Sequence, residues 1–168
     1  MKEIALDNST AVFLAKLGLF PLLIKQGIKF ITTPEIEEEI GIGMREGYRD
    51  ASVRKQLIED KKILIIPANA KTQIQKEYGI TGADASIFAL AKERGSMFAT
   101  EDRTLQNLAK SQNIHVTTTG ILLYALYIKK VIGKEQALML CDLLEIYGYG
   151  KGEILHIKGK MIRGGTNG

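Results

Sequence analysis

The sequence predicts an α/β fold in which a central parallel β-sheet of four to five strands lies between layers of helices. Short apolar runs, some of them rich in β-branched residues, alternate with longer segments whose apolar residues recur at helical spacing. Strands that alternate with helices are typical of βαβ units, in which each crossover helix returns the chain to a parallel neighbouring strand. The chain has 168 residues and no internal repeat, so we expect one domain.

Each predicted strand is a short, mostly apolar run, and the helical pattern fills the segments between the strands. The five runs are residues 4–6, 30–32, 63–66, 97–100 and 115–117. The predicted helices are residues 10–26, with a break near Gly18 or Pro21, and then 34–45, 51–61, 83–94, 104–112, 122–131 and 135–147. The glycine-rich residues 148–152 are predicted to form a flexible turn. We assign residues 1–163 to one domain, residues 120–158 to its helical C-terminal part, and residues 164–168 to a mobile tail.

The composition excludes several classes of protein. Hydrophobic residues make up 45% of the chain and charged residues 25%, which excludes disorder. A single cysteine, Cys141, cannot form an internal disulfide or a cysteine-rich zinc site, and it suits a cytoplasmic protein. No apolar run is long enough to span a membrane. The net charge of +4 is compatible with a polyanionic partner, and the basic residues of segment 45–55, Arg54 among them, fit either phosphate contacts or a solvated helical face.

Two aspartates stand where a predicted strand ends and a helix begins. Asp7 follows the strand at residues 4–6, and Asp102 follows the strand at residues 97–100. In open α/β sheets, ligand sites form beyond the carboxyl ends of the strands, so residues far apart in the sequence can meet there. Taken alone, each aspartate is more simply explained as a helix cap that accepts hydrogen bonds from free backbone amides.

Two further acids lie on predicted helices and lean toward the body of the protein. Glu39 borders the apolar stripe of the helix at residues 34–45, whereas Glu38 lies on the opposite, solvated side. Asp84 shares a face with the apolar residues that follow it, although residues 81–84 also fit a capping box. Four acids gathered in one place repel one another, and divalent metal ions are the natural compensation.

The order of these segments resembles the PIN-domain ribonuclease family. The resemblance covers roughly residues 4–119 and rests on Leu6-Asp7-Asn8-Ser9, Thr33 to Ile40, Gly82 to Ala91 and Ala99 to Leu105. PIN domains are metal-dependent nucleases with a central parallel sheet. At the last acidic position the family's T-x-D pattern selects Asp102 over its neighbour Glu101. The resemblance implies six site residues: the catalytic, metal-binding acids Asp7, Glu39, Asp84 and Asp102, and the accessory hydroxyl residues Ser9 and Thr100.

The function implied by this resemblance is that of an endoribonuclease that hydrolyses RNA with the help of Mg²⁺ or Mn²⁺. Residues 100–109 resemble ribosomal-RNA-processing PIN nucleases of archaea, which also carry a zinc ribbon that one cysteine cannot supply. Residues 118–123 and the helical segment after them resemble stand-alone, toxin-like PIN proteins. The toxin component of a toxin–antitoxin pair is therefore favoured over an RNA-processing enzyme, with an antitoxin as partner. The apolar segment 121–128 favours a homodimer.

Two other classes of protein also place acids at the ends of strands. A phospho-accepting receiver domain needs a second acid beside the first aspartate and a lysine after the last strand. Here Asn8 follows Asp7, and threonines at 117–119 follow the last strand. A degenerate PIN module that only binds RNA or protein would not need all four acids, and their retention disfavours it.

Overall fold

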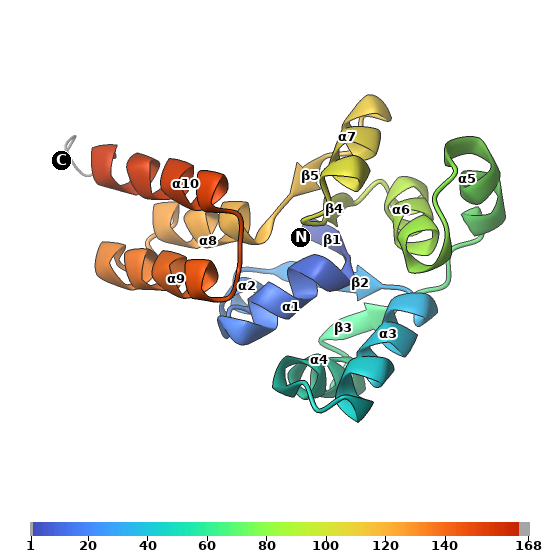
Figure 1. Cartoon of the computed structure of the whole chain (residues 1–168), viewed down its shortest axis with the longest axis horizontal. Coiled ribbons are helices and arrows are strands. Elements are labelled where there is room, and N and C mark those ends of the chain that lie inside the picture. The colour runs from blue at the N-terminus through green and yellow to red at the C-terminus, as the bar shows by residue number, and fades with distance from the viewer. Residues whose placement is uncertain (1, 165–168) are drawn as a thin grey trace.

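The computed structural model describes residues 2–164 and contains a five-stranded sheet flanked by helices (Figure 1). The strands are β1 (Lys2–Leu6), β2 (Ile28–Thr32), β3 (Ile63–Ile65), β4 (Met97–Ala99) and β5 (Val116–Thr117). All of them are parallel, in the order β3-β2-β1-β4-β5. This confirms the predicted α/β class, and each predicted strand overlaps one strand of the structure.

Helices fill the connections between the strands and continue after the last one. They are α1 (Asn8–Lys16), α2 (Phe20–Lys25), α3 (Pro34–Arg45), α4 (Arg49–Glu59), α5 (Lys71–Tyr78), α6 (Gly82–Arg94), α7 (Arg103–Ser111), α8 (Thr119–Ile128), α9 (Lys134–Ile146) and α10 (Lys151–Arg163). The expected break in the first helical segment falls between α1 and α2, where Gly18 has a φ of +64° that favours glycine. None of the helices in residues 2–164 is long and apolar enough to cross a lipid bilayer.

The structure differs from the prediction at two helices. The helix α5 has one fully buried side chain, Ile74, so it lacks the repeated apolar positions that reveal a helix in a sequence. The helix α10 begins inside the glycine-rich segment 148–152, so the prediction of a flexible turn there is wrong for its last two residues. It extends past residue 158 to Arg163. Gly164 is its C-cap, and the rest of the predicted mobile tail lies outside the described residues.

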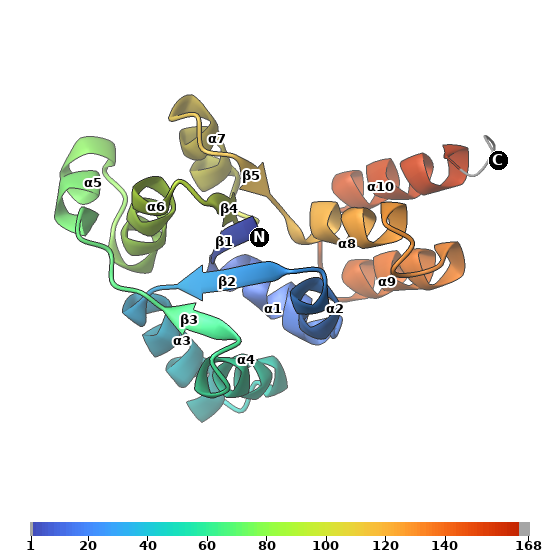
Figure 2. The ribbon, with the colours of Figure 1, turned by 180° about the vertical axis from the view of Figure 1, so that it is seen from behind.

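The sheet separates two hydrophobic cores. In β1, Ile4 and Leu6 belong to one core and Ala5 to the other, as the alternation of side chains along a strand requires. The first core contains side chains of α1, α2 and α8–α10, and the second contains side chains of α3 and α5–α7. Figures 1 and 2 show α8–α10 gathered beside α1 and α2, at the end of the molecule away from α5 and α6.

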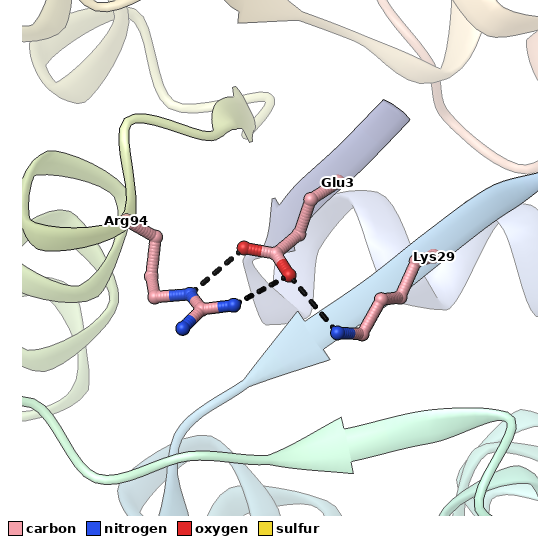
Figure 3. A network of polar contacts seen from close by, with 3 residues as sticks. All are labelled: Glu3, Lys29 and Arg94. Atoms are coloured by element: carbon pink, nitrogen blue, oxygen red, sulfur yellow. Dashed lines mark hydrogen bonds and ion pairs between the residues drawn. The ribbon is translucent and has the colours of Figure 1, made fainter. Parts of the chain in front are cut away.

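The amino edge of the sheet carries a network of paired charges (Figure 3). Glu3 of β1 accepts hydrogen bonds at 2.9 Å from Nε and Nη2 of Arg94, the last residue of α6. The ammonium group of Lys29, on the neighbouring strand β2, lies 3.2 Å from the same carboxylate. Both cations lower the pKa of Glu3, Arg94 most strongly. This network ties α6 and β2 to β1, so its role at the amino edge is structural.

The strand order creates a switch point between β1 and β4. From β1 the chain moves outward to β2 and β3 on one side, and β4 and β5 extend the sheet on the other side. The loops that follow β1 and β4 therefore start side by side, and the Asp7 N–H donates to the Ala99 carbonyl at 3.0 Å. Crevices that bind ligands form at such switch points, beyond the carboxyl ends of the strands.

Candidate functional site

Asp7 is the buried centre of the site, with 5% of its surface exposed. It is the N-cap of α1, and its Oδ1 accepts a hydrogen bond at 2.7 Å from the Asn8 N–H. Its Oδ2 accepts two more, from Ser9 Oγ at 2.7 Å and from Thr100 Oγ1 at 2.8 Å. The two residues predicted as accessory hydroxyls thus hold the same oxygen of the same carboxylate, one from α1 and one from the end of β4.

The environment of Asp7 opposes its ionisation in spite of these donors. Burial raises the pKa of the Asp7 carboxyl, because the charged form loses its hydration. The hydrogen bonds from Ser9 and Thr100 lower this pKa in part, and the negative charge of Asp102 raises it further. A buried carboxyl between favourable donors and an unfavourable charge is the kind of group that a cation stabilises.

Asp102 faces Asp7 across the switch point, from the loop after β4. It is the N-cap of α7, and its Oδ1 accepts a hydrogen bond from the Leu105 N–H at 2.9 Å. Its own N–H donates to Thr100 Oγ1 at 3.1 Å, so Thr100 links the two aspartates directly. Asp102 is exposed, and its Oδ2 has no hydrogen-bond donor among residues 2–164. The capping role considered for Asp102 is therefore present, and it leaves one carboxylate oxygen open to solvent.

Glu39 and Asp84 approach the same region from α3 and α6. The pKa of Glu39 is raised first by partial burial and then by the charges of Asp7 and Asp84. Partial burial also raises the pKa of Asp84, followed by the charges of Asp7 and Asp102. The ionised form of each of these two carboxyls is therefore disfavoured by burial and by the charges of other acids among the four. Thr81, the N-cap of α6, makes no side-chain capping bond, so the capping box considered for Asp84 does not form.

The donor set fits a hard divalent cation in chemistry, although the four side chains do not surround one common point in this conformation. Carboxylate oxygens are the ligands that Mg²⁺ takes from proteins. Among residues 2–164, no group of three or more His, Cys, Asp and Glu side chains is arranged so that it could hold a metal ion. Glu39, Asp84 and Asp102 are exposed side chains, so close packing does not hold these three carboxylates in their present orientations.

Arg54 is a part of this region that sequence reasoning interpreted wrongly. Its exposed fraction is 3%, so it does not belong to a solvated helical face. Its Nη2 donates to Asp50 Oδ2 at 2.8 Å, and its Nη1 donates to Asn8 Oδ1, next to Asp7. Its charge lowers the pKa of Glu39 in part. The i,i+4 spacing of Asp50 and Arg54 was the available signal, but a pair on one helix does not by itself indicate burial.

A hollow of about 290 Å³ opens beside Glu39, between α1, α3 and α4. Its lining includes Asn8, the buried Arg54, Lys16 and the exposed Tyr48. This hollow gives the acidic region a neighbouring space with an aromatic ring, a cation and hydrogen-bonding groups at its surface.

The parallel sheet and the two aspartates at its switch point define an α/β protein with acidic residues at the carboxyl edge of its sheet. A family model described as a PIN domain matches residues 3–149, which is most of the chain. The chain therefore belongs to the PIN-domain family, as the resemblance in the sequence predicted. PIN domains are generally nucleases that act on RNA and use divalent metal ions. A search of curated proteins finds no match.

Proposed function

We propose that the protein is an endoribonuclease that hydrolyses RNA phosphodiester bonds with Mg²⁺ or Mn²⁺ held by Asp7, Glu39, Asp84 and Asp102. The observation that carries this proposal is the pair of strand-end aspartates, Asp7 and Asp102, which Thr100 links by two hydrogen bonds. Burial first, and then the charge of another of the four acids, raises the pKa of Asp7, Glu39 and Asp84. Such mutual repulsion has no benefit for a purely structural cluster, and a bound cation removes it. Membership of a family of nucleases supports the same conclusion.

The proposed roles follow from how each carboxylate is held. Asp7 is the fixed ligand, because Asn8, Ser9 and Thr100 hold both of its oxygens in place. Asp102 is oriented through one oxygen by α7 and offers the other. When bound, a divalent cation lowers the pKa of water and offsets the charge that develops on the phosphate. None of these side chains has to act as a covalent nucleophile.

A comparison of two adjacent glutamates tests the proposal. Glu38 and Glu39 are both exposed residues of α3, and they point in different directions around the helix. Glu39→Gln should lower Mn²⁺-dependent cleavage of a fluorescent RNA by at least about tenfold, whereas Glu38→Gln should leave it unchanged. Equal activity of the two variants would contradict the role proposed for Glu39, and an inactive wild-type protein would contradict the proposed function.

We also propose that the protein is a toxin-like member of the family, with an antitoxin as its partner and the cytoplasm as its location. The resemblance of residues 118–123 to stand-alone PIN proteins supports this. So do Ile121 and Ile128 of α8, which are 48% and 57% exposed and offer apolar surface to a protein partner or a second copy. Expression in a bacterial host should arrest growth, and Asp102→Asn should abolish the arrest. Normal growth with altered processing of ribosomal RNA would favour the RNA-processing alternative.

A further inference from the structure

The loop after β4 sends its side chains in two directions. Thr100 and Asp102 face the acidic site, whereas the side chain of Glu101 between them is directed toward α1 and α8. The family pattern gives Glu101 no role, and the proposed function does not use it. Its carboxylate is nevertheless half-buried and accepts more hydrogen bonds than that of Asp102.

The Glu101 side chain joins two helices, α1 and α8. Its Oε1 accepts hydrogen bonds from the backbone N–H of Thr119 at 2.7 Å and from Thr119 Oγ1 at 2.6 Å, at the start of α8. The same oxygen accepts from Thr10 Oγ1 of α1 at 3.0 Å. Burial raises the pKa of the Glu101 carboxyl, and the Tyr149 hydroxyl, from the connection between α9 and α10, lowers it in part. Thr10 and Thr119 are fully buried, so water cannot easily replace these bonds.

The start of α8 is in turn held against α10. The Gly120 N–H donates to the Tyr149 hydroxyl oxygen at 3.2 Å, and Thr118, the N-cap of α8, bonds to Glu153 of α10. A larger side chain at Gly120 would force a neighbour to shift, since an added Cβ would lie 2.5 Å from Ile157 Cδ1. The carboxylate of Glu101 therefore accepts hydrogen bonds from the N-terminus of α8, which its own contacts hold against α10. Negative charge is favoured at a helix N-terminus.

The backbone of Glu101 completes the connection to the acidic site. Its N–H donates to Ser9 Oγ at 3.1 Å, and Ser9 Oγ donates to Asp7 Oδ2 at 2.7 Å. The side chain of Glu101 thus fixes its own peptide against α8, and that peptide orients a donor to Asp7. Any movement of Glu101 also displaces Thr100 and Asp102, its two neighbours in the chain.

We infer that Glu101 is a positioning residue that couples the helices α8–α10 to the acidic edge of the sheet. The C-terminal helices thereby belong to the site, although they carry none of its four acids. The expected effect of Glu101 on the strength of metal binding rests on the proposed function. The structural part of the inference, the fixing of residues 100–102 by hydrogen bonds from α1 and α8, stands independently and can be measured separately.

Two variants with one control test the inference. Glu101→Gln keeps the size of the side chain but loses its charge, and Tyr149→Phe removes one hydroxyl without touching any of the four acids. Asp142→Asn is the control, because it weakens the bond between Asp142 and Lys158 on the exposed side of α9 and α10. The measurements are amide hydrogen exchange at residues 100–102, Mn²⁺ affinity by calorimetry, and kcat and KM for RNA cleavage.

We expect faster exchange at residues 100–102 in both variants, with unchanged exchange at Ile4 and Phe30 in the centre of the sheet. Mn²⁺ affinity and kcat should fall by about tenfold, as is typical when a group that supports a metal ligand is removed. The KM for RNA should change much less, and the control should match the wild type. A merely structural role would lower thermal stability and leave metal affinity and kcat of the folded protein unchanged.

The outcomes separate this inference from the proposed function. Wild-type exchange rates and Mn²⁺ affinity in a folded Glu101→Gln would overturn the inference while the proposed function stands. A wild-type protein that binds no Mn²⁺ would overturn the proposed function, and the exchange at residues 100–102 would still decide whether Glu101 fixes this loop. Should Glu101→Gln fail to fold, the milder Tyr149→Phe gives the same readouts.

Discussion

At the scale of single residues, the site depends on hydroxyl groups as much as on carboxylates. Thr100 donates to Asp7 and accepts from the Asp102 N–H, so one fully buried side chain relates the two strand-end aspartates. Ser9 gives the same oxygen of Asp7 a second donor. These bonds partly offset the effect of burial on the pKa of Asp7 and fix the direction of its carboxylate.

Thr100→Val removes this hydroxyl and keeps the shape of the side chain. We expect the pKa of Asp7 to rise further and the free energy of unfolding to fall by about 1–3 kcal/mol, because a buried acceptor loses its donor. Thr117→Val is a matched control: Thr117 is equally buried on the adjacent strand, but its Oγ1 has no partner among residues 2–164. Urea denaturation should show a loss for Thr100→Val only, and equal losses would argue against this role of Thr100.

At the scale of elements, the close approach of α8 and α10 depends on a glycine inside a helix. Gly120 lies in the first turn of α8, where alanine has the higher helix propensity. An added Cβ would, however, lie 2.5 Å from Ile157 Cδ1 and 2.7 Å from Glu153 Oε1. Ile157 is buried and Glu153 is held by Thr118, so neither side chain can move without loss of a contact.

Gly120→Ala should therefore lower the free energy of unfolding by about 1–3 kcal/mol, the usual effect of overpacking. Gly152→Ala in α10 is the control, because no atom lies within 4 Å of its added Cβ. Alanine should stabilise the helix at that position by up to about 1 kcal/mol. Thermal denaturation of the two variants would contradict this account if Gly120→Ala were the more stable one.

At the scale of the whole molecule, the sequence predicted those features that depend on residues close together in the chain. Asp7 directly follows β1, Asp102 lies in the loop after β4, and Glu39 borders an apolar stripe, so local order was enough to propose these three as site residues. The burial of Arg54 and the contacts of Glu101 could not be predicted in this way. They depend on how α1, α4 and α8 pack together, and they join residues 18 to 91 positions apart in the sequence. The helix α5 stayed hidden because it buries one residue fully.

The pH dependence of stability follows from the carboxyls with raised pKa: Asp7, Glu39, Asp84 and Glu101. Between their ordinary values of 3.8 and 4.5 and the raised values, the folded state binds more protons than the unfolded state. Stability therefore falls as the pH rises through this window. The lowered pKa values of Glu3 and Glu35 act in the opposite direction, and only below 4.5.

We expect the metal-free protein to be more stable at about pH 5 than at about pH 7, measured by urea denaturation in the presence of a chelator. Mg²⁺ should reduce this difference, because it stabilises the ionised carboxylates at the higher pH. A stability that rises steadily across this range, with or without the cation, would show that ionisation of these carboxyls does not destabilise the folded protein.

The exposed apolar side chains of the C-terminal helices predict self-association. Besides Ile121 and Ile128 of α8, the helix α9 exposes Met139 and Ile146, which are 54% and 75% exposed. Two-fold pairing is the commonest arrangement that covers such a surface. Light scattering should give a dimer mass at micromolar concentration, and Ile128→Lys should shift the protein toward the monomer. A monomer at all concentrations up to the millimolar range would rule out the homodimer.

The central claim, that the four acids exist to hold a cation, is tested most directly by Asp7→Asn. Asparagine is nearly isosteric and caps helices about as well as aspartate, so a capping role predicts little change. We predict that the metal-free variant is at least as stable as the wild type, since one buried charge and its repulsion are gone. Mg²⁺ or Mn²⁺ should raise the melting temperature of the wild type clearly and that of the variant little. Equal metal-induced stabilisation of the two proteins would contradict the claim and leave Asp7 as a helix cap.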